Sequence, residues 1–154
     1  MTRTQALINI LINNQSKLLA SLIRVEQSYL KIKEINWKIE ELEDDELEHW
    51  ESYTSRFSRT IDLFLSKYIR SYLAYKDPGF KGTLRDYLNK MEKLGLINSS
   101  ESWIELKELR NSQAHEYEEE ELDNVFFNFK KNYVILNEIK NAINIIDKEI
   151  NEIK

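Results

Sequence analysis

The sequence predicts an all-α protein, an antiparallel up-and-down bundle of four main helices plus one short helix. Two observations predict this class. The 154 residues include only 3 Gly and 1 Pro, too few turn residues for a many-stranded sheet, and apolar residues recur every three or four positions over long stretches. With 42% apolar residues, a chain of this length is expected to fold as a single domain, residues 1–154, around one core.

The first long helix is expected to carry an apolar stripe from Leu18 to Leu42 and to end near Asp44-Asp45. Asn36 falls within this stripe. A polar residue in an apolar seam can fix the register of two paired helices, so Asn36 hints at a contact with a partner helix.

The second helix is expected to begin at Asp45, because Asp45 and Glu48 have the spacing of a capping pair. Its apolar side recurs from Trp50 to Tyr72. Asp77-Pro78-Gly79 then predicts a turn that ends it.

A short third helix is expected from Thr83, which could cap with Asp86, to about Leu94, with Gly95 at its C-cap. Asn98 and Glu101 have capping-box spacing and predict the start of the fourth helix. That helix would carry Trp103, Leu106 and Leu109 inward. The last helix is expected from near Glu119 to the C-terminus, with an apolar side from Leu122 to Ile153.

The composition excludes several kinds of protein. Without cysteine there is no disulfide framework and no thiolate chemistry, which fits a cytoplasmic location. The apolar run Ala6–Ile12 is short and lacks the small residues of a signal-peptide cleavage site. No apolar stretch approaches the roughly 20 residues needed to cross a bilayer, so no membrane association is expected.

The net charge of −5 argues against a general nucleic-acid coat, which needs a basic surface. The middle of the chain is more basic than its acidic flanks and could line a local basic cleft. Its cationic residues are Lys67, Arg70, Lys76, Lys81, Arg85, Lys90 and Lys93.

Only two histidines could serve an active site, His49 and His115. His49 has no nearby partner with a clear role and is interpreted as structural. His115 lies close in sequence to Arg110, Asn111 and Tyr117. A histidine can take a proton from a ribose 2′-hydroxyl near neutral pH, and an arginine can hold a phosphate, so the cluster suits phosphoryl chemistry.

Helical geometry places Asn111 and His115 on one face, but Arg110 and His115 roughly 140° apart. One straight helix therefore could not aim both side chains at a single phosphate. Either the helix ends between them or a symmetry-related copy supplies the missing half across a two-fold axis, and we favour the homodimer. The alternative is a structural role, in which these side chains only cap the helix or pair with glutamates.

The residues Arg110-(four residues)-His115-Glu116-Tyr117, with Asn111 directly after the arginine, resemble the R-x4-H-x-Y signature of HEPN proteins. Within that superfamily, the segment is most similar to the HepT-like, nucleotidyltransferase-associated branch. The resemblance extends to Trp103–Lys107 upstream and to Arg56–Leu73, and covers about residues 45 to 125.

This resemblance implies a HEPN-like bundle and a metal-independent endoribonuclease toxin of a toxin-antitoxin pair, without a cofactor, that cleaves RNA as a homodimer. Arg110 and His115 would be catalytic, and Asn111 would support them. The antitoxin would be a cognate minimal nucleotidyltransferase that adenylylates (AMPylates) Tyr117. The N-terminal 40 or so residues are longer than a minimal HEPN bundle needs.

Two alternatives stay open. Related HEPN subunits are non-catalytic: they dock on a nucleotidyltransferase and assist its substrate binding. A helical interaction protein with no link to nucleic acid is the third possibility.

Overall fold

The structure is a computed structural model that describes residues 1–112 and 119–153, without the side chains of residues 112, 119 and 120. Every regular element in these ranges is helical. In chain order they are α1 (Arg3–Ile32), η1 (Ile39–Glu41), α2 (Asp44–Leu63), η2 (Phe64–Tyr68), α3 (Ile69–Lys76), α4 (Leu84–Lys93), α5 (Ser100–Ser112), α6 (Glu119–Lys131), η3 (Asn132–Ile135) and α7 (Leu136–Ile153).

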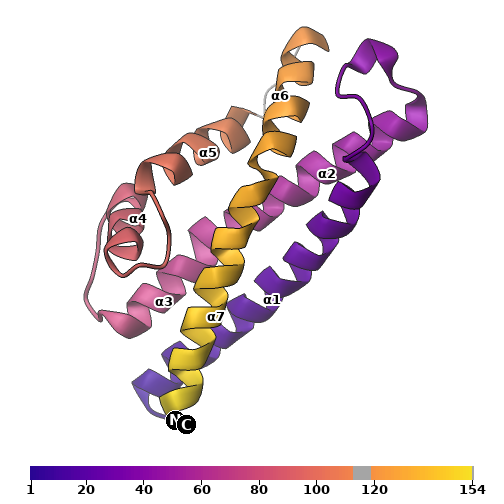
Figure 1. Ribbon diagram of the computed structural model, residues 1–154. Helices are drawn as coiled ribbons and strands as arrows, with labels where there is room; N and C mark the ends of the chain where they lie inside the picture. Colours follow the sequence, from indigo (N-terminus) through magenta and orange to yellow (C-terminus); the bar gives the residue numbers. More distant parts are fainter. Residues whose placement is uncertain (113–118, 154) are drawn as a thin grey trace.

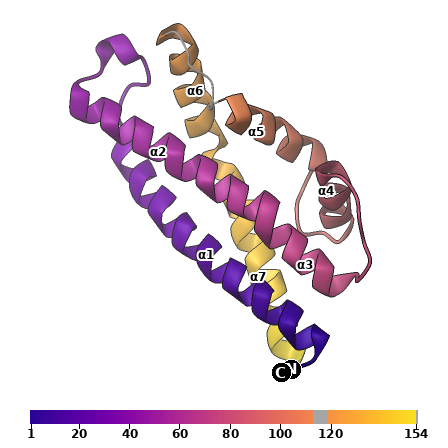
Figure 2. The same ribbon diagram turned by 180° about the vertical axis from the view of Figure 1, so that it is seen from behind.

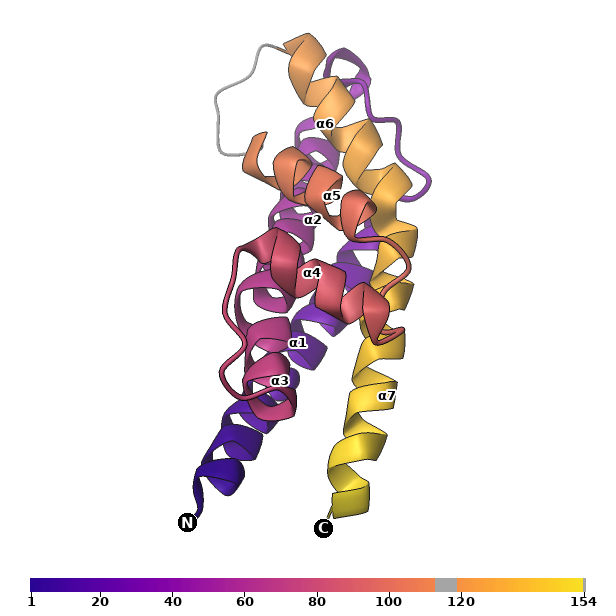
Figure 3. The ribbon, with the colours of Figure 1, turned by 90° about the vertical axis from the view of Figure 1, so that its left-hand side faces the viewer.

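Three long rods make up most of the molecule (Figure 1). The first is α1, the second is the continuous run α2–η2–α3, and the third is α6–η3–α7. The second rod returns antiparallel to the first, and both termini lie at the same end of the bundle (Figures 1 and 2). The shorter helices α4 and α5 lie obliquely across one side (Figure 3). The predicted all-α bundle is therefore confirmed.

The first helix differs from the prediction at its end. It stops at Ile32, about ten residues before the expected Asp44-Asp45, and Ile39 lies in the separate 3-10 turn η1. Asn36 explains the early stop: its side-chain oxygen accepts from the Lys38 N–H (3.0 Å), and its carbonyl accepts from Trp50 Nε1 (2.8 Å). Such local bonds compete with helical ones. Asn36 is thus a loop residue, and the predicted register-setting helix contact is wrong.

The start of α2 also lies earlier than predicted. Glu43 is the N-cap residue, and its N–H donates to the Glu46 carboxylate at 3.0 Å, so Asp45 and Glu48 are not the capping pair. Asp44 and Asp45 instead occupy the first turn. Carboxylates are favoured there because the helix dipole is positive at its N-terminus.

Between α2 and α3 the helix widens into the single π-helical segment η2, which the sequence did not predict. Its wider hydrogen bonding is seen where the Ile69 N–H donates to the Phe64 carbonyl, five residues back. The rod continues without a break to Lys76, and the turn at Asp77-Pro78-Gly79 ends it as predicted.

The signals around α4 are confirmed. Thr83 Oγ1 accepts from the Asp86 N–H, the Thr83 N–H donates to the Asp86 carboxylate, and Gly95 adopts a left-handed φ of 77° after the helix. The start of α5 lies one residue beyond the prediction. Ser99 Oγ accepts from the Ser102 N–H at 3.3 Å, whereas the Asn98 N–H donates to Glu138 of α7.

The core between the rods is rich in aromatic side chains. Trp50 of α2 stacks on Phe126 of α6 with ring centroids 5.0 Å apart, and Trp103 of α5 meets Phe64 at 4.8 Å. The buried Tyr53 hydroxyl donates to the Phe129 carbonyl at 2.7 Å. The last rod begins near Glu119 as expected, but η3 interrupts it, and Ile153 at its end is exposed rather than buried.

Candidate functional site

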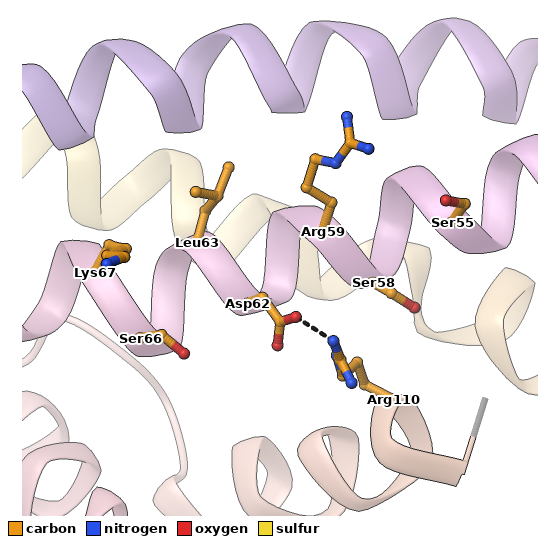
Figure 4. A pocket seen from close by; sticks show the side chains of 8 residues that line it. All are labelled: Ser55, Ser58, Arg59, Asp62, Leu63, Ser66, Lys67 and Arg110. Carbon is orange, nitrogen blue, oxygen red and sulfur yellow. Dashed lines mark hydrogen bonds and ion pairs between the residues drawn. The ribbon is translucent and has the colours of Figure 1, made fainter. Parts of the chain in front are cut away.

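Arg110 lies in the last turn of α5 and reaches across to the C-terminal end of α2. Its Nη2 donates to the Asp62 carboxylate in an ion pair (Figure 4). The side chains are 29% and 41% exposed, respectively, so the pair sits at the surface rather than in the core. Partly exposed ion pairs add about 0–1 kcal/mol of stability, so this contact is a weak tether between α5 and α2.

One buried donor of Arg110 has no partner. Its Nε is buried and has no hydrogen-bond partner within the part of the chain that the structure describes. A guanidinium can bind two oxygens of a carboxylate or phosphate through two parallel N–H bonds. Arg110 does not use this bidentate geometry toward Asp62, because only its Nη2 donates to that carboxylate. An oxyanion with two accessible oxygens would match this arginine better than Asp62 does alone.

A groove opens beside this pair, between α2 and the end of α5, with a cavity volume of about 490 Å³ (Figure 4). Its lining residues are Ser55, Ser58, Arg59, Asp62, Leu63, Ser66, Lys67 and Arg110. Three side chains bring positive charge and one brings negative charge. The groove is thus locally basic on a chain whose net charge is −5.

The π turn explains how two of these cations share one groove. In a regular α-helix, Lys67 would lie about 80° around the axis from Arg59, eight residues earlier. The wider turn η2 begins at Phe64 and rotates the residues after it back toward the side of Arg59. Both residues line the same groove as a result, and π turns are frequent at functional sites.

A second, smaller hollow of about 440 Å³ continues toward the start of α2 and shares Ser55 and Arg59 with the first. Glu48 and Glu51 balance the arginines there. Arg56 is also held in place, because its Nη1 donates to the Ser28 hydroxyl at 2.8 Å and to the Arg24 carbonyl at 3.2 Å. Of these two neighbouring hollows, the groove beside Arg110 is therefore the one with excess positive charge.

The predicted site residues divide into two groups. Arg110 lies in the groove and Asn111 beside it is exposed, while His115 and Tyr117 lie outside the described residues. His49 is half-buried on α2. The structure therefore places one of the two predicted catalytic side chains.

The seven cations expected to form one basic cleft are divided: Lys81, Lys90 and Lys93 line a separate hollow of about 420 Å³ beside α4, together with Asp86. Lys67 lines the groove beside Arg110. Three of the others form ion pairs: Lys76 with Glu149, Arg85 with Glu101 and Lys90 with Asp77. Arg70 stacks over the Tyr87 ring, with its guanidinium carbon 4.6 Å from the ring centroid. Sequence reasoning missed Arg59 and Asp62. Their signal was the spacing of the polar residues Ser55, Arg59, Asp62 and Ser66 on one face of α2.

Among the residues described, no group of three or more His, Asp or Glu side chains is placed to hold a metal ion, and no helix is long and apolar enough to cross a membrane. Comparison of the chain with models of known protein families, with curated proteins and with solved structures finds no match. The fold and the groove define an all-α bundle with a surface site suited to an oxyanion.

Proposed function

We propose that this protein is a HEPN-like, metal-independent endoribonuclease that cleaves RNA as a homodimer through Arg110 and His115. The observation that carries the proposal is Arg110 itself. It lies at the edge of a locally basic groove and keeps a buried Nε without a partner among the described residues. A scissile phosphate could accept from the donors that Asp62 does not use.

The chemistry follows from the residue types. His115 would take the proton of a ribose 2′-hydroxyl, and the 2′-oxygen would attack the neighbouring phosphorus. The bond from phosphorus to the 5′-oxygen would break, that oxygen would receive a proton, and a 2′,3′-cyclic phosphate would remain. Arg110 would stabilise the charge that builds on the phosphate, with Asn111 as polar support.

The dimer is part of the same proposal. Because Arg110 and His115 would face about 140° apart on a continuous helix, a second copy across a two-fold axis would complete each site. As a toxin, the protein would act in the cytoplasm and be restrained by a cognate minimal nucleotidyltransferase. This antitoxin would transfer AMP from ATP to the Tyr117 oxygen, which would lose its proton as pyrophosphate leaves, and the product would carry bulk and negative charge two residues from His115.

One observation favours the non-catalytic alternative, a HEPN subunit that docks on a nucleotidyltransferase. The Arg110–Asp62 ion pair gives the arginine a structural role that needs no RNA. The two functions differ in their behaviour without a partner protein. The enzyme would cleave RNA alone, whereas the docking subunit would not.

The test is cleavage of single-stranded RNA by the purified chain in the presence of a metal chelator. We expect cyclic phosphate ends, and we expect both His115→Ala and Arg110→Ala to abolish them. Arg85→Ala is the matched control, because it removes an arginine that pairs with a carboxylate outside the groove. Activity retained in both site variants would refute the proposal, provided that circular dichroism shows an intact helical signal.

The proposed transfer of AMP to Tyr117 has a separate test. Incubation with the nucleotidyltransferase and ATP should add one AMP to the chain, located at Tyr117 by mass spectrometry. Tyr117→Phe should abolish the addition and leave RNA cleavage unrestrained by the partner. An unmodified Tyr117 beside an inhibited enzyme would exclude this route of control.

A further inference from the structure

The groove beside Arg110 holds two cations that the proposed chemistry does not use. Arg59 and Lys67 are both exposed and line the groove, and neither makes an ion pair in the ranges 1–112 and 119–153. The cations of the middle helices that form ion pairs, Lys76, Arg85 and Lys90, do so away from this groove. Lysines and arginines without partners in a concave site favour a polyanion.

The two cations follow one another along a single helical rod. Arg59 and Lys67 are eight residues apart on one rod, about 12 Å along the axis. Asp62 lies between them in sequence and is directed toward Arg110 of α5 (Figure 4). Because Arg59, Lys67 and Arg110 all line one groove, a chain of phosphates that occupied the whole groove would meet all three cations.

Hydroxyl groups accompany the charges. Ser55 and Ser66 are exposed on the same groove wall and can donate to phosphate or ribose oxygens. The groove is bounded by α5 on one side and offers one row of cations. A single strand matches this shape, whereas a duplex presents two backbones across a wide groove.

We propose that Arg59 and Lys67 bind the phosphates that flank the scissile phosphate of a single-stranded RNA, so that the substrate follows α2 past Arg110. This inference rests on the proposed ribonuclease function for its choice of RNA over DNA. The π turn η2 is the structural device that aligns the two cations, since it brings Lys67 to the side of Arg59.

The experiment measures binding rather than cleavage, so that the two proposals can fail separately. In a His115→Ala background, fluorescence anisotropy of a short end-labelled single-stranded RNA is followed over a salt titration. Arg59→Gln and Lys67→Gln should each raise the dissociation constant about three- to tenfold. Each should also reduce the slope of log affinity against log salt by about 0.7, the value for one lost contact with a single strand.

Matched controls separate the groove from net charge. Arg24→Gln and Lys17→Gln remove the same charges from exposed positions on α1. We expect them to leave affinity within about twofold of the parent, and Arg59→Lys to restore most of the affinity that Arg59→Gln loses. Thermal melting of each variant checks that the bundle is intact.

Equal losses of RNA affinity in the groove variants and in the α1 controls would overturn the inference. Undetectable RNA binding by the parent would overturn it as well. A duplex of the same sequence that binds as tightly as the single strand would also overturn it. If the groove variants lose binding but the unmutated chain cleaves no RNA, Arg59 and Lys67 still bind single-stranded RNA as inferred, and the ribonuclease proposal fails. RNA cleavage that is unchanged in the Arg59→Gln and Lys67→Gln variants would overturn the inference and leave the ribonuclease proposal standing.

Discussion

The guanidinium of Arg110 donates to the carboxylate of Asp62, and this contact joins the last turn of α5 to the C-terminal end of α2 across 48 residues of sequence. The carboxylate offsets the charge of one of the three cations that line the groove. It also occupies one of the donors that a phosphate would use. Under the proposed function, Asp62 and the substrate therefore compete for Arg110.

Asp62→Asn tests this competition. Removing the negative charge should raise RNA affinity about threefold or more in the His115→Ala background, because Arg110 keeps its full charge for phosphate. Because the pair is partly exposed, the free energy of unfolding should fall by less than about 1 kcal/mol. Anisotropy and urea unfolding measure the two effects. Glu101→Gln, which breaks the Arg85 pair outside the groove, is the control, and unchanged or weaker binding by Asp62→Asn would rule out competition.

Tyr53→Phe should destabilise the fold although it alters only one atom. The buried Tyr53 hydroxyl is the donor to the Phe129 carbonyl at 2.7 Å, and its loss leaves that carbonyl unsatisfied between α2 and α6. The expected loss in the free energy of unfolding is about 1–3 kcal/mol. Urea unfolding measures it, with Tyr75→Phe on the half-buried side of α3 as the control. Similar stabilities for both variants would show that the hydrogen bond is not important.

Gly95 is expected to be more sensitive to alanine than to asparagine. Its φ of 77° is left-handed, and its N–H donates to the Glu92 carbonyl as α4 ends. A Cβ there meets no atom within 4 Å, so any cost comes from the backbone conformation alone. We expect Gly95→Ala to lose about 1–2 kcal/mol and Gly95→Asn to lose less, since asparagine tolerates this region. Equal melting temperatures for the two variants would contradict this explanation.

Stability should fall at alkaline pH because of two buried tyrosines. Burial raises the pKa of Tyr53 and of Tyr68 well above the ordinary value of a tyrosine, so the folded protein holds both phenols neutral. Below the unfolded pKa both states are protonated and stability is complete. As pH rises beyond it, the unfolded chain loses protons that the folded chain keeps, and stability declines.

Urea unfolding at about pH 8 and about pH 11 measures this loss. Tyr68→Phe should make the difference in unfolding free energy between the two pH values smaller than in the parent. Replacing an exposed lysine such as Lys17 should leave it unchanged. A parent protein that is equally stable at both values would contradict the assigned shifts.

Helix boundaries were predictable where a local signal decided them. Thr83 with Asp86 and Gly95 after α4 needed only neighbouring residues, and the structure has both as expected. The end of α1 was not predictable in this way. The apolar residues after Ile32 continue the helical spacing, but Asn36 binds Trp50 from the next helix, a contact with no sequence signal of its own.

The sequence by itself determined that the protein is an all-α bundle and that Arg110 lies on the helix that carries Trp103, Leu106 and Leu109, because periodicity and capping act over a few residues. Only the tertiary structure decided what Arg110 faces. Asp62 binds it because α5 packs on α2, and Arg59 and Lys67 line the same groove because a π turn rotates the helix. Packing between distant segments and a local change of helical pitch are collective properties, so no short pattern of residues specifies them.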